Sequence, residues 1–227
     1  MAKKDLIVLI HGWGGTDKSL LPLSEVLSKD FDVLNFNLPG FGGSEEPTNV
    51  WGISDYAQWV LEQVKGKGFD TFHIVGHSFG GQVATQIALL SPQKVKSLTL
   101  IGAAVIRKKS NKTKLIGFLS KRINKTGLGL FSRLLQSSDY SKASDKMRNI
   151  MSKILAEDLS DKLYKVSIPT LILWGEKDRQ TPLSQAKTIK NLMPKAELEI
   201  IAGVGHNLPL LKPEFVGEII LKHIKKW

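Results

Sequence analysis

The chain has 227 residues, enough for one large domain or a domain with an insertion, and its 42% hydrophobic and 23% charged residues are ordinary for a globular protein. It contains no cysteine, which excludes disulfides, thiol catalysis and thiolate metal ligands. The formal charge is +11, and no apolar run approaches the ~18 residues of a membrane-spanning helix, so a cytoplasmic protein is expected.

Short apolar runs alternate with helical segments along the chain. We predict strands at 5–10, 32–37, 71–76, 96–101, 169–174 and 197–201, and helices at 19–28, 54–66, 80–91, 183–193 and 212–226. The strand segments are rich in Val, Ile and Leu with little polar alternation, which is typical of strands covered on both faces. Strands that alternate with helices predict a parallel sheet with right-handed crossovers.

The stretch 105–166 interrupts this alternation, because it contains no convincing strand. Two apolar stripes at helical spacing occur in it, the first formed by Leu115, Ile116, Phe118, Leu119 and Ile123 and the second by Met147, Ile150, Met151, Ile154 and Leu155. The stripes also fit ordinary core contacts. We predict a core domain made of residues 1–104 and 167–227, with a helical lid at 105–166 over the carboxyl ends of the strands.

The positive charge is concentrated in this predicted lid. Residues 104–167 hold 15 basic and 5 acidic residues, whereas the rest of the chain holds 17 and 16. A solvated surface is the first interpretation, and attraction to anionic substrates or peripheral contact with an anionic membrane are the alternatives. No aromatic interleaving or nucleic-acid motif accompanies the charge, so we expect no nucleic-acid partner.

The pentapeptide Gly76-His77-Ser78-Phe79-Gly80 joins a predicted strand to a predicted helix. A serine on such a sharp turn is held in a strained backbone with its hydroxyl exposed. Glycine neighbours are needed there because side chains would collide where the chain folds back. The helix N-terminus that follows favours developing negative charge. The pattern therefore predicts that Ser78 is a catalytic nucleophile.

A carboxylate and a histidine follow two later strands. Asp178 comes after the strand at 169–174, and His206 comes after the strand at 197–201. Ligands gather at the carboxyl ends of parallel strands, so these residues are expected near Ser78. We predict Ser78 as nucleophile, His206 as general base and then acid, and Asp178 as the carboxylate that orients it. Glu176 is the local rival to Asp178.

The reaction also requires hydrogen-bond donors for an oxyanion. We predict the backbone N–H groups of Phe79 and Trp13, the latter in a glycine-rich loop after the first strand. His11, Gly12 and His77 are the predicted pocket residues, although His11 also fits a structural brace and His77 fits packing. No histidine and carboxylate cluster has metal-ligand spacing, so neither a metal nor a cofactor is expected.

Together these segments resemble the α/β-hydrolase fold superfamily, and most of all its small lidded serine esterases. The segments that carry the resemblance are 9–15, 37–44, 75–81, 169–178 with Pro182, and Gly205-His206 with Pro213. Position 37 is Asn where the family usually has Asp, at a structural turn. The first strand begins at residue 5, so the resemblance implies an α/β fold with a reduced, mostly parallel sheet of six strands, helices on both faces and a helical lid.

The leading functional hypothesis is a carboxylesterase-like hydrolase that cleaves esters of small to medium acyl chains. Lactone or thioester hydrolysis, acyl transfer, perhydrolysis and C–C bond hydrolysis are alternatives on the same residues, because a fold does not fix a substrate. Ser78 stands where dehalogenases and epoxide hydrolases carry aspartate, which argues against those reactions. A receptor-like ligand-binding protein is the alternative of another class. The expected partner is a small-molecule ester, and an anionic one remains open.

Overall fold

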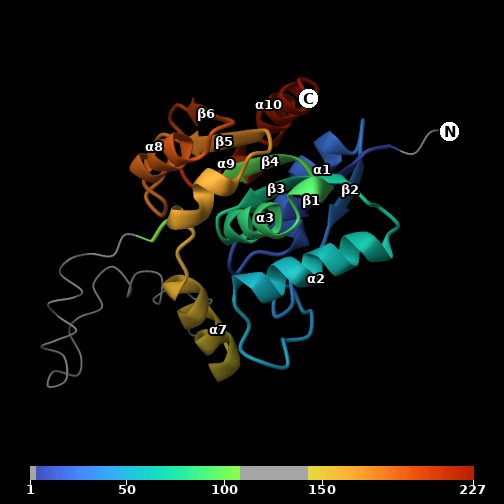
Figure 1. Ribbon diagram of the computed structural model, residues 1–227, viewed down its shortest axis with the longest axis vertical. Coiled ribbons are helices and arrows are strands. Elements are labelled where there is room, and N and C mark those ends of the chain that lie inside the picture. The colour runs from blue at the N-terminus through green and yellow to red at the C-terminus, as the bar shows by residue number, and fades with distance from the viewer. Residues whose placement is uncertain (1–3, 108–142) are drawn as a thin grey trace, which may run out of the picture.

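The computed structural model describes residues 4–107 and 143–227 and is built around a parallel sheet (Figure 1). The strands are β1 (Leu6–Ile10), β2 (Asp32–Asn35), β3 (Phe72–His77), β4 (Val95–Ile101), β5 (Thr170–Gly175) and β6 (Ala196–Ile201). Their order across the sheet is β2-β1-β3-β4-β5-β6, and every pairing is parallel. The strands predicted from the sequence are confirmed to within two residues at each end.

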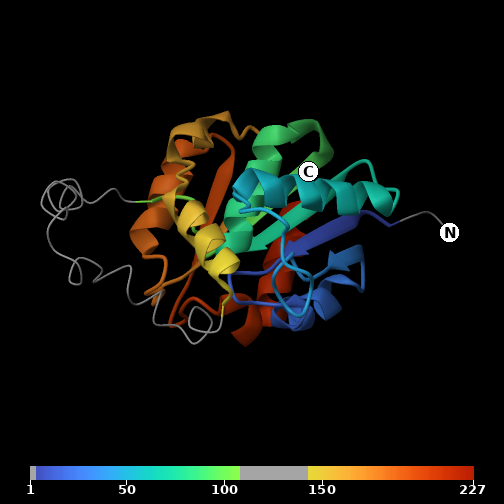
Figure 2. The same cartoon turned by 90° about the horizontal axis from the view of Figure 1, so that it is seen from below.

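Helices cover both faces of the sheet (Figures 1 and 2). The helices of the described residues are α1 (Leu21–Leu27), α2 (Ile53–Gly66), α3 (Phe79–Leu90), α7 (Asp145–Ala156), α8 (Leu183–Leu192), α9 (Leu208–Leu211) and α10 (Pro213–Ile224), with short 3₁₀ turns at Asp17–Leu20, Pro92–Lys94 and Ser160–Lys165. Helices α2, α3 and α8 pack in one hydrophobic cluster, and α1, α9 and α10 pack in the other. The sheet therefore separates two cores.

Alternate residues of each strand supply these two cores. In β1, Leu6, Val8 and Ile10 face α2 and α3, whereas Ile7 and Leu9 face α1 and α10. All five side chains are buried. A strand buried on both faces has no solvent side, which is why its sequence shows a continuous apolar run.

Prolines place two helix boundaries differently from the predicted ranges. The predicted helix at 19–28 is a 3₁₀ turn followed by α1, which has Pro22 in its first turn. The predicted helix at 212–226 begins at Pro213 and is preceded by the separate short helix α9. Proline has no backbone N–H to donate to a preceding turn, so it is tolerated in the first turn of a helix and disfavoured further along it.

Helix α7 is the described part of the predicted lid. Its buried residues include Met147, Ile150, Met151 and Ile154, so the second predicted apolar stripe is confirmed. The first stripe, 115–123, lies outside the described residues. Gly40 has φ +87°, a backbone conformation that favours glycine, and the end of the Met147 side chain of α7 packs against it.

The carboxylate of Glu157, just after α7, joins this segment to helix α2. It accepts a hydrogen bond from the backbone N–H of Ile53 at 3.2 Å. Ile53 is the first residue of α2, where backbone N–H groups lack partners within the helix and the helix dipole favours a negative charge. The end of α7 therefore lies beside the N-terminus of α2 (Figure 1).

Candidate active site

Ser78 occupies the turn between β3 and α3. Its φ is 53° and its ψ is −114°, and it is the one non-glycine residue with positive φ in the described part of the chain. The Ser78 N–H donates to the carbonyl of Ile101, and its carbonyl accepts from the N–H groups of Gly81 and Ala104, each at 3.0 Å. These hydrogen bonds hold the residue in a backbone conformation that costs about 1–3 kcal/mol.

Two glycines make this turn possible. A Cβ on Gly76 would overlap the backbone carbonyl of Gly80, and a Cβ on Gly80 would overlap the carbonyl of Ile10 in β1. Both obstacles are backbone atoms, which cannot move aside as a side-chain tip can. The glycines predicted from the turn pattern are therefore required by close packing of β1, β3 and α3.

Asp178 and His206 form a direct hydrogen-bonded pair at the carboxyl ends of β5 and β6. The Nδ1 of His206 lies 2.7 Å from the Oδ2 of Asp178, and the two side chains are 8% and 1% exposed. The other carboxylate oxygen, Oδ1, accepts the backbone N–H groups of Gln180 and Thr181, both at 2.9 Å. Asp178 is thus fixed in position by the turn that carries it.

The environment of Asp178 keeps its carboxyl ionised. Burial acts to raise the pKa of Asp178, but the hydrogen bond and charge of His206, followed by the hydrogen bonds from Thr181, outweigh it and hold the pKa below its ordinary value. An ionised carboxylate beside Nδ1 fixes the tautomer of the imidazole and leaves Nε2 free to accept a proton. The pair has the arrangement of a general base with its orienting acid.

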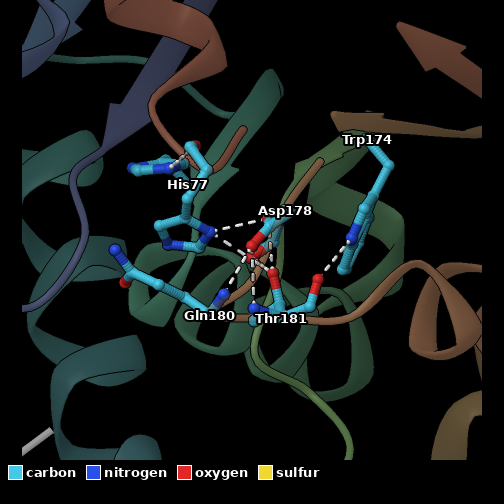
Figure 3. A network of polar contacts seen from close by, with 7 residues as sticks. His77, Trp174, Asp178, Gln180 and Thr181 are labelled. Atoms are coloured by element: carbon cyan, nitrogen blue, oxygen red, sulfur yellow. Dashed lines mark hydrogen bonds and ion pairs between the residues drawn. The ribbon is translucent and has the colours of Figure 1, made fainter. Parts of the chain in front are cut away.

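Thr181 is a functional residue that the sequence reasoning missed. Its hydroxyl lies 2.8 Å from Asp178 Oδ2 and 3.1 Å from the carbonyl of Gly102, and its one proton can serve either acceptor. The Thr181 carbonyl in turn accepts the indole N–H of Trp174 at 2.8 Å (Figure 3). Asp followed three residues later by Thr is a turn pattern that could have indicated this contact.

The segment directly after β4 contacts both Ser78 and the Asp178–His206 pair, through Ala104 and Gly102 respectively. A Cβ on Gly102 would stand 3.1 Å from Asp178 Oδ2 and 3.2 Å from His206 Nδ1. Two residues further on, Ala104 donates its N–H to the Ser78 carbonyl. The residues predicted as nucleophile, base and acid therefore lie at the same edge of the sheet, although they are up to 128 positions apart in the sequence.

Glu176, the rival carboxylate, lies elsewhere. Its side chain is exposed and accepts the backbone N–H of Gly203 at 2.9 Å. Within the described residues, the carboxylate that contacts His206 is that of Asp178. The geometry therefore favours Asp178 over Glu176 as the partner of the imidazole.

The two predicted oxyanion donors have backbone N–H groups without acceptors among the described residues. Phe79 is the first residue of α3, so its N–H has no carbonyl partner within the helix. The N–H of Trp13, in the loop after β1, donates to no described group. The ring of Trp13 packs edge-on against that of Phe79, with centroids 5.6 Å apart. The two segments therefore meet beside Ser78.

His11 braces this loop from inside the protein. It is fully buried, and its Nε2 accepts the Leu38 N–H at 3.1 Å while its Nδ1 lies 2.8 Å from the carbonyl of Gly12. Nδ1 therefore carries the proton, and the ring is neutral. Burial lowers the pKa of His11, although the Gly12 carbonyl opposes this.

His77 supports the backbone of His206. Its Nε2 donates to the carbonyl of His206 at 2.9 Å, and burial, followed by the charge of His206, lowers the pKa of His77 to about 4.

A Cβ on Gly12 would lie 3.2 Å from the Cβ of Ser78, so this glycine allows the loop after β1 to approach Ser78. His11, Gly12 and His77, predicted as pocket residues, are outside the set that lines the cavity at Ser78.

Comparison with known proteins identifies the fold family. A family model described as the alpha/beta hydrolase fold matches residues 5–141, more than half of the chain. The chain belongs to this family. The predicted fold class, an α/β hydrolase with a sheet of six parallel strands between helices, is confirmed.

Relatives of this α/β hydrolase include hydrolases and esterases. The hydrolase YugF of Bacillus subtilis is 24% identical, over 98% of this chain and 90% of its own length. Lipase 3 of a Moraxella species is 26% identical, over 88% of this chain and 71% of its own. The esterase EaEST of Exiguobacterium antarcticum superposes with a TM-score of 0.78 at 21% identity, over 99% and 93% of the two chains.

A cavity of about 60 Å³ opens at Ser78 in this α/β hydrolase. Its wall is mainly apolar and combines residues of the core with residues of α7. It is lined by Trp13, Ser78, Phe79, Ala104, Arg107, Met151, Ile154, Leu155, Gln180 and Thr181. Helix α7, the described part of the predicted lid, therefore forms one wall of the cavity with residues of its apolar stripe.

Arg107 is a second residue that the sequence reasoning missed. In the sequence it is one of 15 basic residues in the stretch 104–167, and nothing in the pattern separates it from the others. In the hydrolase it lines the cavity together with Ser78.

The described residues of the hydrolase contain no cluster of three or more histidine, cysteine or acidic side chains that could hold a metal ion. Within residues 4–107 and 143–227, no helix has both the length and the apolar character needed to cross a membrane.

Proposed function

We propose that this α/β hydrolase is a serine esterase that cleaves carboxylic esters through Ser78, His206 and Asp178. The observation that carries the proposal is the strained backbone of Ser78 at the start of α3, at the same edge of the sheet as the Asp178–His206 pair, whose Nδ1 and Oδ2 are 2.7 Å apart. A strained backbone at a site with a paired base is typical of an activated nucleophile.

In the proposed reaction, Ser78 Oγ attacks the ester carbonyl carbon and its proton passes to His206 Nε2. Asp178 holds the Nδ1–H throughout, and the oxyanion accepts the N–H groups of Phe79 and Trp13. The C–O bond to the alcohol then breaks as His206 returns the proton to the alcohol, which leaves an acyl-serine. Water gives a proton to His206 and attacks the acyl carbon, and Ser78 regains its hydrogen as the acid departs.

The cavity supports a preference for short acyl chains. Its volume of about 60 Å³ corresponds to about four water molecules at ~15 Å³ each. Such a space, lined by apolar side chains, suits a chain of a few carbon atoms. We therefore propose substrates with small to medium acyl groups.

We also propose that residues 105–166 form a cap over the core domain. In support, α7 contributes Met151, Ile154 and Leu155 to the cavity wall. The cap returns to the core through the N–H of Leu159, which donates to the carbonyl of Val105 at 3.1 Å. That hydrogen bond joins the two ends of the proposed cap.

Hydrolysis of p-nitrophenyl esters from acetate to palmitate by the wild type and Ser78→Ala tests the function. We expect turnover that is strongest for short chains and that falls at least about 10⁴-fold in kcat for Ser78→Ala, as for loss of a serine nucleophile. A rate unchanged by Ser78→Ala would overturn the proposal. No turnover on any ester would instead favour a receptor-like protein.

A further inference from the structure

Arg107 places an incompletely paired cation at the cavity of the proposed nucleophile. One terminal nitrogen, Nη2, donates to Gln82 Oε1 at 3.1 Å. The Nε is buried and has no hydrogen-bond acceptor among the described residues. No described carboxylate lies within ion-pair distance of the guanidinium. A guanidinium has five N–H donors, so most of its donors are unused within this part of the chain.

Arg107 is half-buried, so its charge is partly removed from water without an ion-pair partner in the described part of the chain. Burial lowers the pKa of Arg107, and the nearby charge of Asp158 only partly opposes this. Asp158 does not form an ion pair with Arg107, and its Oδ1 accepts the N–H of Ser160 at 2.9 Å. Arginine stays protonated in proteins, so the site keeps a positive charge beside apolar side chains.

Gln82 orients Arg107 and does not neutralise it. The Gln82 side chain is fully buried in α3, and its Nε2 donates to the Glu157 carbonyl at 3.0 Å, which leaves Oε1 to accept from Arg107. An amide oxygen is uncharged, so this contact fixes one edge of the guanidinium without cancelling its charge. A purely structural link between the segment after β4 and α3 does not need a cation.

We propose that Arg107 binds a carboxylate carried by the substrate, so that the preferred esters are half-esters of short dicarboxylic acids or short acyl esters of hydroxy acids. This proposal rests on the esterase function proposed above. A guanidinium fork matches a carboxylate with two parallel hydrogen bonds, which suits the unused donors of Arg107. Because the cavity at Ser78 is small, the carboxylate must lie only a few bonds from the ester.

Two isosteric substrate pairs test this recognition. Monoethyl succinate and ethyl 4-methylpentanoate differ only by a carboxylate in place of an isopropyl group on the acyl side. The pair 3-acetoxypropanoate and 3-methylbutyl acetate makes the same exchange on the alcohol side. Simple alkyl leaving groups limit self-cleavage of the half-ester through an anhydride. The readout is the ratio of kcat/KM for the anionic ester to kcat/KM for its neutral partner, from acid release in a pH-stat.

The variants are Arg107→Met, Arg107→Lys and the control Lys162→Gln, which removes one exposed positive charge from the 3₁₀ turn at Ser160–Lys165. In at least one pair, we expect Arg107→Met to lower the ratio about 10- to 100-fold, the usual effect of a hydrogen bond to a charged group. Arg107→Lys should restore part of the ratio, since it keeps the charge but loses the fork. Lys162→Gln should leave the ratio unchanged. Thermal melting of each variant checks that it folds.

The outcomes separate this proposal from the esterase proposal. An unchanged ratio in both pairs for folded Arg107→Met, with turnover that still requires Ser78, overturns carboxylate recognition alone. Equal losses on both esters of a pair overturn it too and indicate a general electrostatic effect. Calorimetric binding of the same four esters to Ser78→Ala and to Ser78→Ala/Arg107→Met gives a readout without turnover. There, we expect Arg107→Met to weaken binding of the anionic ester alone, and equal affinities would contradict the proposal.

Discussion

At the scale of single residues, the site depends on how completely Asp178 is hydrogen-bonded. Its Oδ1 accepts two backbone N–H groups, and its Oδ2 faces His206 Nδ1 at 2.7 Å and the Thr181 hydroxyl at 2.8 Å. A carboxylate with two backbone donors on one oxygen, and the imidazole and a hydroxyl at the other, is held in its orientation by the protein. The imidazole that it orients is thereby directed toward the edge of the sheet that carries Ser78.

Thr181→Val tests how much the Thr181 hydroxyl contributes to this hydrogen-bond network. Valine has the same shape but lacks the hydroxyl, so Asp178 loses one hydrogen bond while the backbone contacts remain. We expect kcat/KM for short esters to fall about 10-fold, the effect of losing a hydrogen bond to a charged group. The low-field proton resonance of His206 Nδ1–H should shift. Thr188→Val, on the exposed face of α8, is the control; equal rates in the two variants would contradict the role of Thr181.

At the scale of elements, the site depends on three backbones that approach without side chains between them. Gly76 and Gly80 lie on either side of Ser78, and β1 passes beside the start of α3 at the carbonyl of Ile10. This contact sets where the helix begins relative to the sheet. It therefore also sets where the free N–H groups of its first turn point.

Gly80→Ala should break this junction. The added methyl group would meet the Ile10 carbonyl, so we expect the free energy of unfolding to fall by at least about 3 kcal/mol, or soluble protein to be lost. Gly66→Ala, at the end of α2 with nothing near its added methyl, is the matched control and should gain about 0.5–1 kcal/mol. Urea unfolding measures both. A Gly80→Ala protein within about 1 kcal/mol of the wild type would refute the packing argument.

At the scale of the whole molecule, buried histidines link folding to pH. His73 is buried in β3 with its Nδ1 2.8 Å from the Ser97 hydroxyl. Burial lowers its pKa to about 4, while Asp5 opposes this shift and Lys96 and His223 add to it. Between pH 6.5 and pH 4, His73 is therefore mostly neutral in the folded protein and mostly protonated in the unfolded chain. Stability is retained above pH 6.5 and lost as pH falls toward 4.

His73→Leu should reduce this acid sensitivity. The pKa difference predicts that His73 alone removes about 2 kcal/mol of the free energy of unfolding between pH 7.5 and pH 5. Urea unfolding at the two pH values should show a fall smaller by that amount in His73→Leu. Ser97→Ala removes the same hydrogen bond but keeps the titrating ring, so its fall should equal that of the wild type. Identical falls in wild type and His73→Leu would contradict the assignment.

The sequence by itself determined the order and type of the elements. Both faces of the sheet are covered, so the inner strands are strongly apolar in sequence, and every strand was predicted to within two residues. It also marked Ser78, Asp178 and His206 as candidates, because each follows a strand and parallel strands share one carboxyl edge. These inferences rest on local patterns, which a linear sequence records directly.

Only the tertiary structure decided which side chains touch. It brought Thr181 to the carboxylate of Asp178, and it set Arg107 apart from the other basic residues by placing it at the cavity of Ser78. It also left His11 and His77 out of the cavity lining, and each is hydrogen-bonded to the backbone of another segment, at Leu38 and at His206. Burial, charge pairing and hydrogen-bond partners arise from residues far apart in the chain. These properties are therefore defined only when the folded sheet brings the loops after its strands together.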